Sequence, residues 1–217
     1  MFRKTLLLLF NLVLFAVSYS QAKFGVKGGI SQSTVKEDLN LPDINYSLQN
    51  GYQFGVFAEK SFTENIFFRP SLQLTQKGYK SVVGNPGGPF YWNRDLLTTY
   101  LELPLDIIYK FRLNNALNLF IGTGPVLSYG IQGRLKATHV TMDNNQQLHT
   151  KISTDNNIFR NNIDRRFDFG WNASGGIQSC KMMFSLSYNH GITNVVKDAN
   201  QSLKNKSFAF TVGYLVR

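Results

Sequence analysis

The sequence contains a single cysteine, Cys180, which excludes both an intramolecular disulfide framework and a multi-cysteine zinc site. Its three histidines, His139, His149 and His190, cannot fill a structural zinc site without help from carboxylates. Charged residues make up only 17% of the chain, less than the roughly 25% of soluble domains. Aromatic residues reach 14%, which argues against disorder, because disordered chains contain few of them. The 217 residues therefore predict one folded domain.

Long apolar runs are confined to the N-terminus, where two basic residues precede an apolar stretch from Leu6 to Val17, followed by the small residues Ser18 and Ser20. A basic start, a short apolar core and small residues before a cleavage point are the parts of a secretory signal peptide. The apolar stretch is shorter than the ~20 residues of a membrane-spanning helix. We expect residues 1–20 to be a signal peptide and residues 21–217 to work outside the cytoplasm.

Beyond the N-terminus, apolar residues alternate with other residues at a period of two, the pattern of a strand with two unlike faces. The clearest case is the segment 101–112, where every second residue from Leu101 to Phe111 is apolar or aromatic. The length of most of these segments is close to the roughly 9–11 residues that a tilted membrane-spanning strand needs. Eight segments show the pattern: 24–31, 52–59, 66–75, 101–112, 117–132, 167–178, 182–189 and 208–216.

The connections between these segments alternate in length. In an antiparallel sheet this places every short turn at one end and every long loop at the other, as in outer-membrane barrels. An even number of strands allows the sheet to close. The short turns are 63–65, 113–116 and 179–181, and the long connections are 34–50, 80–98, 136–166 and 190–206. The sequence therefore predicts an all-β fold, an eight-stranded antiparallel up-and-down transmembrane β-barrel.

The two faces of the strands indicate which side meets lipid. The non-apolar face is rich in Gly, Ser, Asn and Gln, which suits the crowded interior of an eight-stranded barrel. Aromatic residues near the strand ends predict interfacial belts. We expect one belt at Tyr52, Tyr100, Tyr129, Phe167, Tyr188 and Phe208, and the other at Phe62, Phe68, Tyr109, Phe111 and Tyr214. The alternative is a secreted soluble lipocalin-like barrel, which would keep its apolar face inward around a ligand.

A few charged residues fall on the predicted inner face. They are Lys27, Glu59, Arg69, Glu102, Asp106, Lys110 and Asp168. An isolated ion in a narrow lumen is costly, so we expect a paired network. Arg69 is expected to pair with Glu102 or Asp106 on the following strand. An ion or proton path is the alternative, but the interior of an eight-stranded barrel is normally filled by side chains.

Four segments carry a resemblance to a known family: Phe24–Ile30 (FGVKGGI), Tyr100–Leu105 (YLELPL), Leu119–Pro125 (LFIGTGP) and the last strand, Phe208–Val216. In these segments the mature chain resembles the outer-membrane β-barrel family common in Bacteroidota, the PorT-like barrel domain. Its architecture is similar to that of OmpA and OmpX. The resemblance implies contact with outer-membrane lipid and with the outer-membrane assembly machinery, and it implies no particular activity. The last residue, Arg217, departs from the aromatic end of many barrels.

No arrangement typical of a catalytic, metal or cofactor site is present. Ser187 and His190 are three residues apart on a strand, which places them on opposite faces. His139, His149 and Asp143 lie in the third long connection without a recognisable spacing. We therefore expect no enzymatic activity, no metal and no cofactor. The formal charge of +10 would favour binding to polyanions, but export separates the chain from cytoplasmic nucleic acid.

Exposed loops are the usual carriers of function in such a scaffold. The connection 80–98 contains the aromatic residues Phe90, Tyr91 and Trp92, which either pack on the barrel rim or contact a partner. The sequence favours a non-enzymatic outer-membrane protein with a structural, adhesion or partner-binding role, the partner being an extracellular or envelope protein. A small pore or a hydrophobic-ligand transporter is the alternative.

The third long connection, 136–166, has apolar residues between polar ones, which predicts that strands five and six continue as a hairpin above the membrane. Asp143, Asn144 and Asn145 are expected in its turn, because Asp and Asn tolerate left-handed backbone conformations. The apolar residues are Val140, Met142, Leu148, Ile152 and Ile158.

Overall fold

The structure is a computed structural model that describes residues 22–37, 44–84, 90–114, 116–142, 148–156, 158–159, 165–196 and 202–216. The expected signal peptide lies outside these residues. These residues form ten strands: β1 (Lys23–Glu37), β2 (Ile44–Ser47), β3 (Gln49–Ser61), β4 (Ile66–Gly84), β5 (Phe90–Arg112), β6 (Leu117–Met142), β7 (Leu148–Asp155), β8 (Phe167–Ser179), β9 (Met182–Gly191) and β10 (Leu203–Leu215). No helix in the described part of the chain is long and apolar enough to span a membrane.

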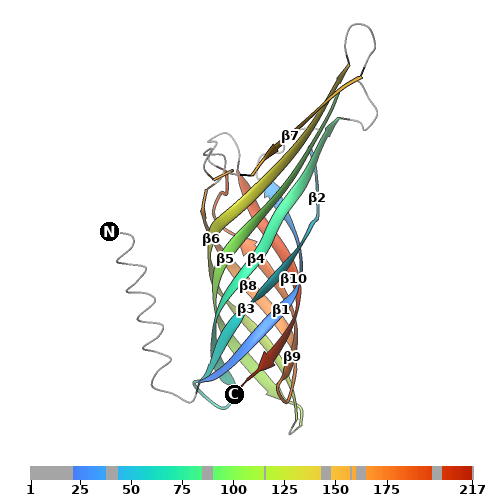
Figure 1. Cartoon of the computed structure of the whole chain (residues 1–217). Helices are drawn as coiled ribbons and strands as arrows, with labels where there is room; N and C mark the ends of the chain where they lie inside the picture. Colours follow the sequence, from blue (N-terminus) through green and yellow to red (C-terminus); the bar gives the residue numbers. More distant parts are fainter. Residues whose placement is uncertain are drawn as a thin grey trace, which may run out of the picture.

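Eight of these strands close into one antiparallel ring (Figure 1). The order around the ring is β1–β3–β4–β5–β6–β8–β9–β10, and β10 pairs with β1 to complete it. Closure leaves each ring strand paired on both sides, as a strand in hydrocarbon requires. The predicted eight-stranded antiparallel barrel is therefore confirmed. The two additional strands, β2 and β7, pair with β4 and β6.

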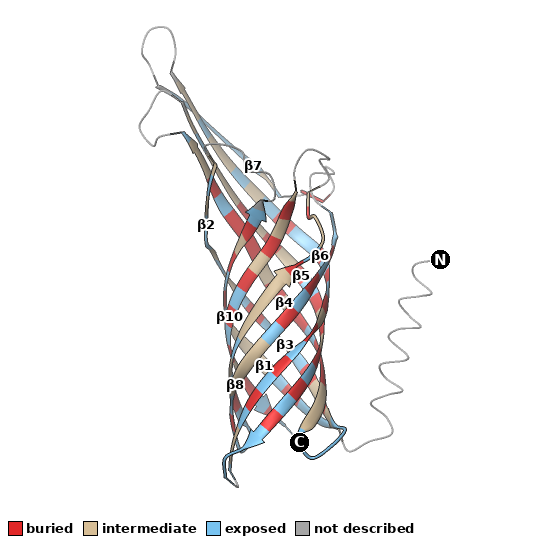
Figure 2. Ribbon diagram, turned by 180° about the vertical axis from the view of Figure 1, so that it is seen from behind, coloured by how far each residue is buried: buried red, intermediate tan, exposed pale blue. Residues whose placement is uncertain are grey.

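The wall of the barrel is apolar outside and polar inside. Buried and exposed residues alternate along its strands (Figure 2). Ile30 is 68% exposed and Leu186 is 66% exposed on the outer face, whereas the polar residues Ser31, Gln53 and Thr211 are buried inside. This inside-out arrangement matches a barrel in lipid. It contradicts the alternative of a soluble lipocalin-like barrel, whose outer face must be polar.

Most of the expected aromatic belt residues lie on the outside. Tyr100 does not: it is only 3% exposed, and the Lys77 ammonium lies 5.9 Å from its ring centroid. The expectation for Tyr100 is wrong because the odd-numbered positions of β5 face outward in this region, so position 100 faces the lumen. The exposed members are Tyr52, Tyr129, Phe167 and Phe208 at one end and Phe62, Tyr109, Phe111 and Tyr214 at the other.

The short turns and both ends of the ring lie at one end of the barrel (Figure 1). Residues 62–65 join β3 to β4, and Cys180 with Lys181 forms the turn between β8 and β9. The Val216 amide donates a hydrogen bond of 2.8 Å to the Phe24 carbonyl, which ties the end of β10 to the start of β1. The expected distribution of short and long connections is therefore confirmed.

Two of the expected long loops are largely strand. In the connection 80–98, β4 and β5 stay paired as far as Gly84 and Tyr91. In the connection 136–166, β6 and β7 form the expected hairpin, and its turn at Asp143–Asn145 lies outside the described residues. These strands and β2 rise beyond the barrel as one arm (Figure 1), which we call the outer sheet. It consists of β2, β7 and residues 80–84, 90–95 and 134–142 of β4, β5 and β6.

Candidate functional site

Six of the seven predicted inner charges have side-chain partners, and the first group centres on Glu59. The Arg69 guanidinium donates to Glu59 Oε2 from Nε at 3.0 Å and from Nη2 at 2.5 Å. The Lys110 ammonium donates to Glu59 Oε1 at 2.5 Å and to the Gln178 side-chain oxygen at 2.8 Å. We call these four residues the Glu59 cluster. The expected pairing of Arg69 with Glu102 or Asp106 is wrong, because its charge is matched by the other neighbouring strand, β3.

The second group centres on Glu102, near the middle of β5. Its main partner is Lys77 on β4, whose ammonium lies 2.6 Å from Oε1, and both side chains are almost fully buried. Thr75 and Gln73 donate hydrogen bonds to Oε2 at 2.8 and 2.9 Å, and Ser128 donates to Oε1 at 3.1 Å. We call these five residues the Glu102 cluster. Lys77 was not predicted as an inner charge, although it lies on the same face of β4 as Arg69.

The remaining inner charges are held differently. Asp106 accepts hydrogen bonds of 3.0 and 3.1 Å from the Asn172 amide. Asp168 accepts one of 2.7 Å from the Thr193 hydroxyl and one of 2.8 Å from the Asn205 amide. Among the described residues, no salt bridge involves either carboxylate. These two buried carboxylates are therefore stabilised by hydrogen bonds from neutral donors, where we expected ion pairs.

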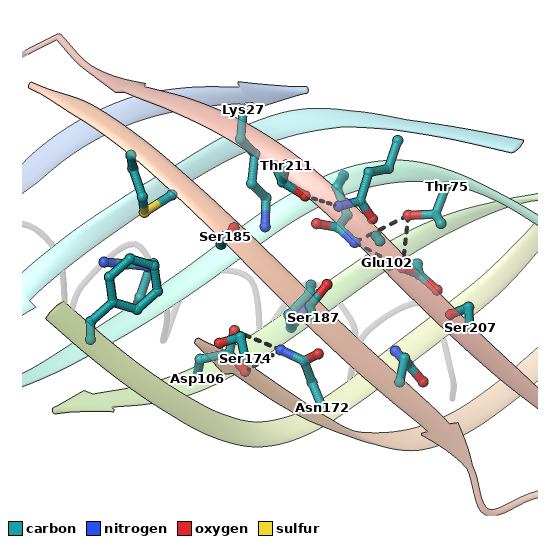
Figure 3. A pocket seen from close by; sticks show the side chains of 18 residues that line it. Lys27, Thr75, Glu102, Asp106, Asn172, Ser174, Ser185, Ser187, Ser207 and Thr211 are labelled. Carbon is teal, nitrogen blue, oxygen red and sulfur yellow. Dashed lines mark hydrogen bonds between the residues drawn. The ribbon is translucent and has the colours of Figure 1, made fainter. Parts of the chain in front are cut away.

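A small polar cavity lies at mid-barrel between the Glu59 and Glu102 clusters. Lys27 points into it from β1, and Asp106 and Asn172 lie on the opposite side (Figure 3). In the described part of the chain, Lys27 forms no salt bridge. The cavity volume is about 50 Å³, enough for a few water molecules.

The mouth of the barrel on the long-connection side is filled by an apolar plug. Ile158 is fully buried and Phe159 is 7% exposed, and both pack with Val35, Tyr79, Leu96, Val195 and Leu203. We call Ile158 and Phe159 the mouth plug. Ile158 was expected in the extracellular hairpin, and the structure places it inside the mouth instead. The sequence signal for this plug is an apolar pair in an otherwise polar segment.

The aromatic run at positions 90–92 does not form one contact surface. Trp92 shares the face of the outer sheet that continues the barrel interior, which we call the inner face, with Arg94 and His139. Tyr91 lies on the opposite, outer face, because neighbouring strand residues point to opposite sides. The Phe90 side chain lies outside what the structure describes. Of the three residues expected either to pack on the rim or to contact a partner, Trp92 is therefore the one that the structure places on the inner face.

Trp92 sits within a small group of aromatic and basic side chains. The Arg94 guanidinium carbon lies 4.2 Å from the centroid of the Trp92 ring, which is a cation–π contact. His139 is the cross-strand partner of Trp92 on β6, and the two ring centroids are 5.7 Å apart. Lys151 on β7 is the next partner in the same row. Trp92 is 41% exposed, so this group is open to solvent.

The described residues bring no catalytic set together. Ser187 lines the mid-barrel cavity, whereas His190 lies beside Tyr188, whose hydroxyl is 3.5 Å from Nδ1. His139 and His149 lie on the hairpin of β6 and β7, and Asp143 falls outside the described residues. Within the described ranges, no group of three potential metal ligands is present.

The chain is similar to known outer-membrane proteins. Residues 16–197 match the family model of the outer membrane protein beta-barrel domain. None of the curated protein sequences matches the chain. Among solved structures, Ail, the attachment invasion locus protein of Yersinia pestis solved with the heparin analogue sucrose octasulfate, is 16% identical, with a TM-score of 0.40 over 89% of this chain and 98% of Ail. Neisserial surface protein A is 13% identical, with a TM-score of 0.46 over 90% and 99% of the two chains.

Proposed function

The chain belongs to the outer membrane protein beta-barrel domain family, and from this premise we propose that it is a non-enzymatic outer-membrane barrel that binds a partner outside the cell. The observation that carries the proposal is the outer sheet. Strand β6 continues from Tyr129 in the aromatic belt to Met142, which is about 43 Å of strand at roughly 3.3 Å per residue. A strand of that length reaches well beyond the polar headgroup layer, whose depth is about 5–8 Å.

The filled lumen supports binding rather than transport. The mouth plug occupies the outer end of the barrel, and the Glu59 cluster lies toward the other end with Phe57, Phe120 and Met183 packed nearby. The cavity between them is about 50 Å³, far below the ~300 Å³ at which small-molecule pockets begin. Transport through the barrel, by a small pore or a hydrophobic-ligand transporter, would require both the mouth plug and the Glu59 cluster to move.

The test combines a conductance measurement with an adhesion assay. The purified barrel in planar bilayers is expected to give no stable single-channel conductance, whereas a large porin serves as the conducting control. Cells that display the full chain are then compared with cells in which an Asn-Gly turn replaces residues 138–152. Loss of adhesion to matrix and cell surfaces in the shortened variant supports the proposal. Unchanged adhesion at equal surface expression contradicts it.

More specific assignments are part of the same proposal. The segments Phe24–Ile30 and Tyr100–Leu105 support membership of the PorT-like barrels common in Bacteroidota. The basic and apolar composition of residues 1–20 supports cleavage of a signal peptide before insertion. The apolar outer face supports contact with outer-membrane lipid and delivery by the outer-membrane assembly machinery. An extracellular or envelope protein is one class of partner for the outer sheet.

A further inference from the structure

The inner face of the outer sheet carries a row of aromatic and basic side chains. Trp92, His139 and Lys151 are successive cross-strand partners on β5, β6 and β7. Arg94 lies two residues from Trp92 on the same face, and its guanidinium carbon is 4.2 Å from the centroid of the Trp92 ring. We call these four residues the inner-face row. It combines the two positive charges of Arg94 and Lys151 with an imidazole and one exposed indole.

The cation–π contact with Trp92 places Arg94 where it can bind an anion. A guanidinium carries its N–H groups in a planar fork, which can donate two parallel hydrogen bonds to an oxyanion. Within the described ranges, Arg94, His139 and Lys151 form no salt bridge. Their donors are therefore available to a ligand.

The two faces of the outer sheet differ in their charge pattern. On the outer face, Asp95 is the cross-strand partner of both Lys80 on β4 and Lys136 on β6. The two cations there flank a carboxylate. On the inner face, the cross-strand partners of Arg94 are the uncharged residues Ser81 and Ala137. In the described strands, no carboxylate is therefore a cross-strand partner of Arg94 or Lys151 on the inner face, where the indole is also exposed.

The position of the row selects the kind of anion. His139 is ten residues beyond Tyr129 on β6, about 33 Å of strand at roughly 3.3 Å per residue. The phosphates of outer-leaflet lipids lie within about 5–8 Å of the hydrocarbon. A ligand for this row must therefore extend into the medium and offer anions at intervals. The apolar face of a sugar ring also suits an exposed indole.

We propose that the inner-face row binds an acidic polysaccharide, with Arg94 and Lys151 engaging its sulfate or carboxylate groups and Trp92 contacting a sugar ring. This inference rests on the proposed function and names the chemistry of the partner. Binding is expected to weaken with salt, because charge pairs on an open surface are screened.

The test uses the folded barrel in lipid nanodiscs. Binding to immobilised dextran sulfate and alginate is measured against neutral dextran. The variant Arg94→Gln/Lys151→Gln is expected to lose at least about tenfold in affinity, since charge-assisted bonds are the strong ones. The matched control, Arg134→Gln/Lys136→Gln, removes the same charge from the exposed outer face of β6 and is expected to change affinity by less than about twofold. Trp92→Leu is expected to weaken binding without changing net charge.

The outcomes separate this inference from the proposed function. Equal losses in the two double variants would mean that only net charge matters, which overturns the inference. The inference also fails if the wild type binds neither polyanion better than neutral dextran, or if vesicles of anionic lipid compete as well as free polysaccharide. If adhesion needs the hairpin but survives Arg94→Gln/Lys151→Gln, the proposed function stands and the polysaccharide assignment is wrong. If adhesion survives loss of the hairpin, the proposed function itself fails.

Discussion

The ring of Phe159 occupies the space beside Gly130 that a side chain at position 130 would need. In the same way, the Ile158 side chain occupies the space that a side chain at Gly133 would need, three residues further along β6. Arg166 contacts both residues. Its guanidinium carbon lies 5.2 Å from the Phe159 ring centroid, and its carbonyl accepts a hydrogen bond of 2.7 Å from the Gly130 amide. The two glycines therefore provide the recess in which the mouth plug packs.

We predict that Gly130→Val expels Phe159 from the mouth while the barrel stays folded, because the new side chain requires the volume of the ring. The chain around Arg165 and Arg166 then becomes accessible, and trypsin is expected to cut there at least about tenfold faster, as cleavage tracks local opening. Gly28→Val is the control, since the nearest atom to its added Cβ is 3.8 Å away. Equal cleavage of the two variants would show that the plug does not depend on Gly130.

The Glu102 cluster predicts a strong coupling between two buried charges. Glu102→Gln alone leaves the Lys77 ammonium buried without its counter-ion, and we expect a loss of about 3–5 kcal/mol in the free energy of unfolding. Lys77→Met/Glu102→Gln is expected to recover part of that loss, because it removes both charges. Urea titrations in lipid vesicles measure Lys77→Met, Glu102→Gln, the double variant and the wild type. Strict additivity of the single losses would contradict the pairing.

Arginine substitutions can test where the membrane ends. Leu105, on the outer face of β5 near mid-barrel, is expected to lose about 2–4 kcal/mol when replaced by Arg. Ile152 on the outer sheet is 61% exposed, and its replacement by Arg is expected to change stability by less than about 0.5 kcal/mol, as on an ordinary surface. The same urea titrations distinguish the two sites. A neutral Leu105→Arg would show that our assignment of the lipid face is wrong.

Alternation and connection length were sufficient to predict the ring. From Leu101 to Phe111 the period of two already separated the lipid face from the lumen, because a barrel in hydrocarbon allows no exchange between the faces. The same rule, applied to position 100, would have placed Tyr100 inside. The strands of the outer sheet were harder to predict, since half-buried and exposed residues occur on both of their faces and the clear alternation is lost.

Interior partners could not be deduced from strand order alone. Arg69 lies opposite Asp106 in the register of β4 and β5, yet its guanidinium binds Glu59 on β3. The regular pairing of β3 with β4 is interrupted around Pro70, which lacks an amide hydrogen to donate. The mouth plug was missed for a similar reason: its recess is formed by glycines on one strand and its side chains come from a distant connection.

The single cysteine offers a test of orientation. Cys180 is exposed in the turn between β8 and β9, at the short-turn end, which faces the periplasm in barrels of this kind. A bulky PEG-maleimide is therefore expected to leave it unlabelled in intact cells and to label it after the outer membrane is permeabilised. The matched probe is Ser153→Cys on β7 in a Cys180→Ser background, which should react in intact cells. Labelling of Cys180 in intact cells would reverse the orientation.

The mouth plug and the hairpin lie in the same long connection, and we predict that they can be separated. Replacing residues 138–152 by Asn-Gly removes the upper part of β6 and β7 but retains Ile158 and Phe159, so the barrel should keep its heat-modifiable migration and its urea midpoint. Ile158→Ser/Phe159→Ser keeps the hairpin but places two hydroxyls in an apolar mouth, and we expect a loss of several kcal/mol, since burying unpaired polar groups and deleting large side chains are both costly.

The two variants should therefore give opposite results in two assays. The shortened hairpin is expected to lose adhesion and keep stability, and the serine variant is expected to keep adhesion and lose stability. Surface expression, measured by protease accessibility of intact cells, is the control for both. If the shortened variant fails to insert into the outer membrane, the hairpin is required for barrel assembly and does not act as a separate binding element. That result would contradict the division of this connection into a plug that closes the barrel and a sheet that projects from it.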